Sequence, residues 1–210
     1  MFRVLLVVAV ALVPLAFAAL GVDVSTPISS SAASCMASNG ISFAVPRCYM
    51  ETGEPDPACA GSIAAINGAG MTAHAYFFPD TSQSASSQAS SFCSFSESNS
   101  LNFEKLWVDI EESDWGSDKA SNCEFIDDLI SSLTSCFPAT GVYTSVYEWG
   151  LICDSSSSAT GTELWYADWD GAADCSAFSP FGPWSSASYK QYAAPSDAFC
   201  GVGIDQDCEC

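Results

Sequence analysis

The most informative stretch of the chain is KLWVDIE at residues 105–111, whose residue types alternate with the period of a half-buried strand. The aliphatic residues at 106, 108 and 110 point to one face, and Trp107, Asp109 and Glu111 point to the other. The segment therefore predicts a strand with an aliphatic face for packing. Its opposite face presents two carboxylates about 6.6 Å apart.

Short apolar or alternating runs recur on both sides of this segment, and segments with helical periodicity lie between them. This order of elements is typical of an α/β domain with a parallel sheet. The predicted strands are residues 21–25, 42–47, 72–78, 105–111, 141–146, 164–167, 189–192 and 202–205.

Gaps long enough for a helix separate the first five strands. Residues 121–137 carry an apolar stripe, and Ser121 with Glu124 forms the pattern of a capping box. Asp56-Pro57 is expected to open a second helix that ends at Gly68 and turns Ala60, Ile63 and Ala64 to one face. The serine-rich residues 81–100 are predicted as a further helix.

The last three strands have shorter connections or connections rich in Gly, Pro and Ser, such as SPFGP at 179–183, where no helix is expected. Together these patterns predict a closed, TIM-like barrel of five β/α units followed by three strands with little helix. No internal repeat or linker divides the chain, so we expect one domain over residues 19–210.

Residues 1–18 have the pattern of a signal peptide: a basic start, an apolar run and the small-x-small site Ala16-Phe17-Ala18. The competing interpretation is a membrane anchor, which the apolar run is too short to favour. We therefore expect the mature chain to begin at Ala19 and to act outside the cell or in an acidic digestive or lysosomal compartment.

The cysteines agree with an oxidising compartment, where disulfides are the default. Their number, 11, is odd, so one thiol is left over or one bond joins two chains. The sequence leaves the pairing open, although Cys200, Cys208 and Cys210 are expected to staple the C-terminal end. One histidine and no Cys-x-x-Cys pair argue against a metal site, and no cofactor is implied.

The chain has 25 acidic and 5 basic residues and a formal charge of −20. Such a charge repels nucleic acid and anionic membranes, so neither partner is expected. We hypothesise work at acidic pH or high salt, where self-repulsion is titrated or screened.

Four acids share one relation to the strands that carry them. Asp23, Asp109, Glu111 and Asp205 each lie opposite the aliphatic residues, near the end of a predicted strand. If the aliphatic faces pack under helices, these carboxyls meet at the barrel mouth, where barrel enzymes keep their chemistry. Clustering raises the pKa of at least one carboxyl, which can then protonate a leaving oxygen while an ionised neighbour stabilises positive charge. That division of roles is what glycoside hydrolysis requires.

A set of motifs in fixed order covers nearly the whole mature chain. These are GVDVS at 21–25, FAVPRCY at 43–49, HAYFFP at 74–79, LWVDIE at 106–111, GVYTS at 141–145, LWYADWD at 164–170, FSPFGPW at 178–184, KQY at 190–192 and CGVGID at 200–205. With these motifs the chain resembles glycoside hydrolase family 25, the Chalaropsis-type lysozymes, and particularly their nematode and protist branch.

The resemblance implies the same barrel and hydrolysis of the β-1,4 bond between N-acetylmuramic acid and N-acetylglucosamine in bacterial cell-wall peptidoglycan. It implies Glu111 as the general acid and Asp109 as the group that stabilises an oxocarbenium-like transition state, in part by orienting the substrate's N-acetyl group. Asp23 and Asp205 complete the acidic floor, and Tyr76, Tyr143 and Trp165 line the sugar groove. One departure is Asp205-Gln206-Asp207, where the family often has Asp-Leu-Asn.

Other residues allow two interpretations each. His74 is the histidine that a nucleophilic triad would need, but a buried, hydrogen-bonded role in the barrel is favoured. Arg47 either binds substrate or neutralises the acids, and the second role is favoured. Trp107 is expected to pack inside the barrel, whereas Trp115, Trp169 and Trp184 rim the cleft or anchor loops.

Two functional alternatives remain open at this point. One is a chitin-directed glycosidase, and the other is a non-catalytic carbohydrate-binding paralogue on the same barrel. Intact acids at all four motif positions argue against the second, since binding alone needs no proton donor. We expect a monomer.

Overall fold

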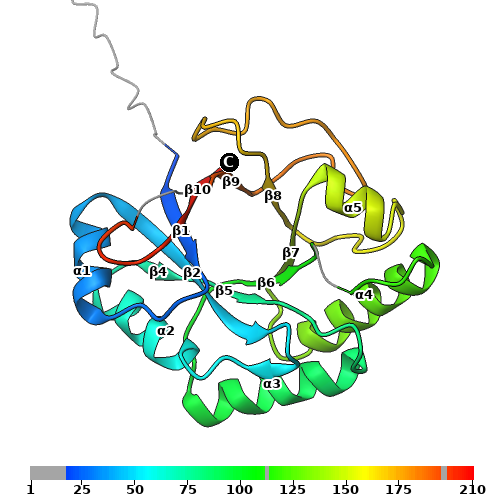
Figure 1. Cartoon of the computed structure of the whole chain (residues 1–210), viewed down its shortest axis with the longest axis horizontal. Helices are drawn as coiled ribbons and strands as arrows, with labels where there is room; N and C mark the ends of the chain where they lie inside the picture. The colour runs from blue at the N-terminus through cyan, green and yellow to red at the C-terminus, as the bar shows by residue number, and fades with distance from the viewer. Residues whose placement is uncertain (1–17, 112–113, 195–197) are drawn as a thin grey trace, which may run out of the picture.

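A computed structural model describes residues 18–111, 114–194 and 198–210, and its strands form a closed barrel (Figure 1). Ten strands form one sheet in the order β1-β10-β9-β8-β7-β6-β5-β2-β3, and a further pairing of β1 with β2 closes it. Because β3 only extends β2 as a hairpin and β4 shares one position with β5, eight positions make up the barrel. The strands are β1 Leu20–Val24, β2 Ile41–Met50, β3 Glu54–Pro55, β4 Thr72–Ala73, β5 Ala75–Phe77, β6 Leu106–Asp109, β7 Thr140–Thr144, β8 Leu164–Ala167, β9 Tyr189–Ala193 and β10 Asp205–Glu209.

The described residues form five helices, which lie outside the barrel and link its parallel strands (Figure 1). They are α1 Ser30–Ser38, α2 Cys59–Gly68, α3 Ala85–Asn99, α4 Lys119–Thr134 and α5 Val146–Ile152. Within the described ranges, no helix lies between β8 and β9 or between β9 and β10. The predicted fold class, five β/α units followed by three strands with little helix, is therefore confirmed.

The helix starts are fixed by polar side chains, though not always the predicted ones. The N-cap of α4 is Asp118, whose side chain accepts a hydrogen bond from the backbone N–H of Ala120. The predicted capping box at Ser121 is therefore wrong, and α4 begins two residues earlier and ends at Thr134. The predicted helix within residues 81–100 is confirmed as α3, with Ser84 as its cap.

Helix α2 starts later than predicted because Asp56 forms a turn ahead of it. Asp56 Oδ1 accepts from the backbone N–H of Ala58, and the helix then runs from Cys59 to Gly68. Its buried face includes Ser62, Ile63 and Ile66. The prediction that Ala64 shares this face is wrong, since Ala64 is exposed.

Two layers of side chains fill the molecule. The aliphatic face of β6 packs beneath the helices, and Leu106 and Val108 are fully buried there. The barrel interior holds a separate cluster of Phe43, Val45, Trp107, Tyr143, Trp165 and Tyr189. Trp107 thus packs inside the barrel, as predicted. It lies so close to β7 that a Cβ at Gly141 would be 2.4 Å from its ring.

The last strand differs from its prediction in a way that matters for the site. It runs from Asp205 to Glu209 rather than from 202 to 205, and it is antiparallel to both neighbours, β9 and β1. Val202 and Ile204 are buried in the segment before the strand, which explains their apolar character. Asp205 therefore begins β10, opposite Asp23 of β1, at the rim where the parallel strands end.

Five disulfides cross-link the barrel: Cys35–Cys200, Cys48–Cys59, Cys93–Cys136, Cys123–Cys153 and Cys175–Cys210. The prediction of C-terminal staples is confirmed for Cys200 and Cys210. It is wrong for Cys208, which is a free, buried thiol within β10. Burial raises the pKa of this thiol to about 11.

The predicted signal peptide falls almost entirely on residues 1–17, which lie outside the described residues. In the part of the chain that the structure describes, no helix is both long and apolar enough to cross a membrane.

Candidate active site

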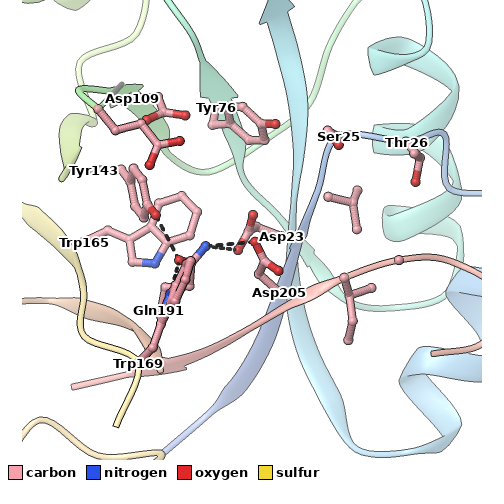
Figure 2. Close-up of a pocket in the computed structure, with 14 residues that line it drawn as sticks. Asp23, Ser25, Thr26, Tyr76, Asp109, Tyr143, Trp165, Trp169, Gln191 and Asp205 are labelled. Carbon is pink, nitrogen blue, oxygen red and sulfur yellow. Dashed lines mark hydrogen bonds between the residues drawn. The ribbon is translucent and has the colours of Figure 1, made fainter. Parts of the chain in front are cut away.

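A hollow of about 430 Å³ opens at the rim where the parallel strands end (Figure 2). The four predicted acids Asp23, Asp109, Glu111 and Asp205 all line it, although they come from three strands far apart in the sequence. Also lining it are Tyr76, Tyr143, Trp165, Trp169 and Gln191. A second hollow of about 610 Å³ adjoins the first and shares Ser25, Tyr76, Asp109 and Glu111 with it. The pair Asp109 and Glu111 thus lies at the junction of one continuous cleft.

Asp109 is the last residue of β6, and its carboxyl is buried. No hydrogen-bond partner for its Oδ1 exists among the described residues. Burial, together with the nearby charges of Glu111 and Asp23, raises the pKa of Asp109 well above its ordinary value. Glu111 follows two residues later on the same face, is half-buried, and its backbone carbonyl accepts from Trp115 Nε1 at 2.9 Å.

Asp23 and Asp205 form the other side of the hollow (Figure 2). Burial, and next the charge of Asp205, raise the pKa of Asp23 to about 7. Burial also raises the pKa of Asp205, though this carboxyl is more open to solvent. The cleft therefore holds several carboxyls that keep protons at pH values where an exposed carboxyl has lost its own.

Gln191 of β9 links the two sides of the hollow, and sequence reasoning assigned it no role. Its Nε2 donates to Asp23 Oδ2 at 2.8 Å and to Asp205 Oδ2 at 3.5 Å. Its Oε1 accepts from Tyr143 OH at 2.9 Å and from Trp169 Nε1 at 2.7 Å (Figure 2). Its only signal in the sequence was its place in the motif KQY.

Asp207 is a second residue with no predicted site role, although it stands where the family often has asparagine. It is fully buried on the same face of β10 as Asp205, and its Oδ1 accepts from Trp165 Nε1 at 2.9 Å. Burial raises the pKa of Asp207 well above its ordinary value, and the charge of Asp23 raises it further.

The predicted aromatic residues Tyr76, Tyr143 and Trp165 all line the first hollow. Trp169 lines its edge and is 63% exposed, so its indole is accessible for stacking. Trp115 and Trp184 pack instead against Phe125 and Trp149, so they anchor loops.

Arg47 lines the second hollow rather than the first. Its Nε lies 3.0 Å from Asp56 Oδ2 and its Nη1 lies 3.5 Å from Glu51 Oε2. No ion pair joins Arg47 to any of the four acids in the described part of the chain, so direct neutralisation of that cluster is not what the structure shows.

His74 is buried inside the barrel and lines neither hollow. Its Nδ1 accepts from Trp107 Nε1 at 3.3 Å, and burial lowers its pKa to about 4. It is therefore a neutral, hydrogen-bonded barrel residue, which leaves no base for a nucleophilic triad at the mouth. Among the described residues, no group of three or more His, Cys, Asp or Glu side chains is arranged to hold a metal ion.

Comparison with known proteins finds relatives that are named as lysozymes or lysozyme-like proteins. The family model described as Lysozyme-like protein 1 matches residues 15–192. The chain is 38% identical over 187 residues to "Probable GH family 25 lysozyme 4" of Dictyostelium discoideum, covering 88% of this chain and 87% of that one. It is 31% identical over 195 residues to "Lysozyme-like protein 5" of Caenorhabditis elegans, covering 89% of each.

The fold also matches solved structures of low sequence identity. One is a family GH25 lysozyme from Aspergillus fumigatus, with a TM-score of 0.73, 16% identity, and coverage of 92% of this chain and 94% of that chain. At such identity the likeness concerns the fold, and it agrees with the closed barrel described above.

Proposed function

The chain belongs to the glycoside hydrolase family 25 lysozymes, and from this we propose that it is a muramidase acting on bacterial peptidoglycan. The reaction is hydrolysis of the β-1,4 bond between N-acetylmuramic acid and N-acetylglucosamine. The observation that carries the proposal is the position of Asp109 and Glu111 at the junction of the two hollows. A glycan that fills both hollows places one glycosidic bond beside this pair.

In the proposed mechanism Glu111 is the general acid that protonates the oxygen of the leaving sugar. This role suits a half-buried carboxyl that lines both hollows and therefore reaches the bond between them. Positive charge then develops on the ring of the sugar in the smaller hollow. The carboxyls of the cluster that are ionised stabilise this charge, and such electrostatic stabilisation is usually the largest single contribution to catalysis.

Asp109 is proposed to position the substrate and stabilise the transition state. Its buried Oδ1 has no partner in the described residues, so it can accept a hydrogen bond from the N–H of a sugar acetamido group. That contact would orient the acetamido carbonyl towards the reacting carbon. Asp23 and Asp205, on the opposite side of the hollow, form the acidic floor of the same sugar site.

Aromatic and cationic residues are proposed to hold the glycan. Trp169 is largely exposed at the edge of the first hollow, and Tyr76 lines both hollows. Arg47 is the basic residue in the lining of the second hollow and is 22% exposed, so it can meet an anionic group of the wall polymer.

The experiment is turbidity clearance of bacterial cell walls by wild type and Glu111→Gln across pH. Removal of a general acid is expected to cost roughly 10²–10⁴-fold in rate. The matched control is Glu97→Gln, the same substitution at an exposed position of α3, which should keep the wild-type rate. A folded wild type that clears no walls at any pH, yet cleaves chitin oligomers, would replace the proposal with a chitin-directed glycosidase. Inactivity on both would leave the binding paralogue.

We also propose that residues 1–18 are a signal peptide and that the mature monomer is secreted or delivered to an acidic compartment. Five disulfides support an oxidising route. N-terminal sequencing of the expressed protein should begin at Ala19, and light scattering should give the mass of one chain. A retained Met1 or a dimer mass would contradict these two statements.

A further inference from the structure

The feature that the proposed mechanism does not use is Asp207, a fully buried carboxyl inside the barrel. It lies one step below the rim on β10, in register with Gly21, while Asp205 is in register with Asp23. The diagonal neighbour of Asp207 across the strand pair is therefore Asp23, and side chains in such positions reach each other.

The hydrogen bonds around Asp207 require a proton on one carboxyl. Trp165 Nε1 donates to Oδ1 at 2.9 Å, and no N–H or hydroxyl of the described residues donates to Oδ2. The Asp23 carboxyl, the diagonal neighbour of Asp207 on β1, is nevertheless close enough to share a hydrogen bond with it. Two carboxylate oxygens only accept hydrogen bonds, so this contact exists only when a proton lies between them.

We propose that Asp207 is a positioning residue that retains its proton inside the barrel and donates it in a hydrogen bond to the Asp23 carboxylate. It touches neither hollow, so it acts through Asp23 and not on the substrate. The inference rests on the proposed function only in assigning Asp23 to the sugar site. The protonation itself is a property of the folded chain.

The charges that face Asp207 favour this state from every side. Asp23 of β1 and Asp205 of β10 are acidic, while Trp165 of β8, Gln191 of β9 and Tyr143 of β7 carry no charge that could compensate an anion. Lys190, also on β9, is fully buried but is bound to both carboxylate oxygens of Asp170 at 2.7 Å. A second charge beside Asp23 would thus be uncompensated in a buried site, and such charges are neutralised by protonation.

Within the pair the proton belongs on Asp207. Asp23 lines the open hollow, and its Oδ2 accepts from Gln191 Nε2 at 2.8 Å. Asp207 has no contact with the hollow and is shielded from water. The ionised member is therefore Asp23, held by two donors and directed towards the sugar site.

The first test measures the folding equilibrium of wild type and Asp207→Asn by urea unfolding between pH 5 and 8. A carboxyl whose pKa is raised by folding loses stability as pH rises, whereas asparagine does not titrate. The ratio of the folding constant of D207N to that of wild type should therefore rise tenfold for each unit of pH. The rise should stop at the pH where folded wild type releases the proton of Asp207. The control is Asp128→Asn on an exposed face of α4, for which the ratio should not change with pH. A pH-independent ratio for D207N would mean that Asp207 is ionised in the fold, and would overturn the proposal.

The second test compares the pH dependence of kcat/KM on cell walls for D207N and Asp207→Leu. An asparagine N–H replaces the proposed O–H donor, so the acidic side of the kcat/KM–pH profile (the acid limb) of D207N should coincide with that of wild type. Leucine donates nothing, Asp23 then ionises less readily, and the acid limb should move to higher pH. An acid limb that moves equally in both variants would contradict the donor role. If wild type is inactive on walls, the proposed function fails, but the unfolding experiment still decides where the proton lies.

Discussion

Replacement of Gln191 by methionine is the most informative perturbation of the cleft, because this amide joins its two sides. The variant keeps a similar volume and removes every hydrogen bond of the side chain. Asp23 loses its donor at 2.8 Å and Tyr143 loses the acceptor of its hydroxyl at 2.9 Å. Trp169 also loses its acceptor, but its side chain is largely exposed and water can replace the bond.

The expected cost follows from the two buried partners. A buried hydroxyl left without a partner costs about 1–3 kcal/mol, and a hydrogen bond to a charged group contributes about 1.5–3 kcal/mol. With Asp23 ionised, Q191M should therefore be destabilised by about 2.5–6 kcal/mol. Below the pKa of Asp23, about 7, this carboxyl is neutral and its lost hydrogen bond costs less. The loss at pH 5 should be smaller than the loss at pH 8 by about 1 kcal/mol or more.

Urea unfolding with the disulfides intact, followed by tryptophan fluorescence at both pH values, measures these differences. Trp169→Phe is the matched control, since it removes only the solvent-exposed donor and should cost less than about 1 kcal/mol. If Q191M loses less than about 1 kcal/mol at both pH values, the Gln191 network contributes no more than a surface contact, and its proposed role in joining the two sides of the cleft is wrong.

Three further predictions concern the whole fold. Because the cleft carboxyls have raised pKa values, the folded chain binds more protons than the unfolded chain. Its stability should therefore fall as pH rises from about 4 through the pKa of Asp23, about 7. A melting temperature that increases over this pH range in calorimetry would contradict this prediction. Gly141→Ala places a Cβ 2.4 Å from the Trp107 ring and should cost about 1–3 kcal/mol. The control is Gly61→Ala in α2, where an added Cβ has no atom within 4 Å, and it should stabilise the fold by up to about 1 kcal/mol. Equal effects of the two substitutions in thermal unfolding would argue against close packing of Trp107 on Gly141. A thiol reagent should find no reactive cysteine in the native chain and one, Cys208, after unfolding without reductant; two or more reactive thiols would contradict the disulfide pattern.

The parts of the fold that could be predicted are those encoded by local periodicity. The alternation in residues 105–111 places aliphatic side chains in the outer core and acids at the mouth, and β6 has this arrangement. The gaps and turn residues between strands were enough to predict that helices link the first strands and that the last three strands follow with little helix. These patterns depend only on the ordinary geometry of a strand or a helix, so they can be interpreted without knowing which segments pack together.

The parts that could not be predicted depend on contacts between distant segments. Gln191 lies 168 residues from Asp23 along the chain, and only strand pairing across the closed barrel brings the two together. The start of β10 was misplaced because Val202 and Ile204 are apolar for burial in a loop, not for a strand face. Because β10 begins at Asp205, the alternation of a strand directs Asp207 into the barrel. The predicted strand ended at residue 205, so it made no prediction for Asp207.

The cap of α4 and the free cysteine show the same limit at short range. Asp118 and Ser121 are both good helix caps, but Asp118 caps α4, and the Ser121 hydroxyl donates to Asp118 Oδ2 instead. Cys208 resembles its neighbour Cys210 in sequence, but only Cys210 faces a partner, Cys175. An odd number of cysteines could show that one was left over, not which one.

The most direct test of the muramidase assignment is the identity of the new reducing end after digestion of purified peptidoglycan. The products would be reduced with borohydride and identified by mass spectrometry, with E111Q digested in parallel. Wild type should give N-acetylmuramitol ends, and E111Q should give almost none. N-acetylglucosaminitol ends from wild type, or equal release by both proteins, would contradict the assignment.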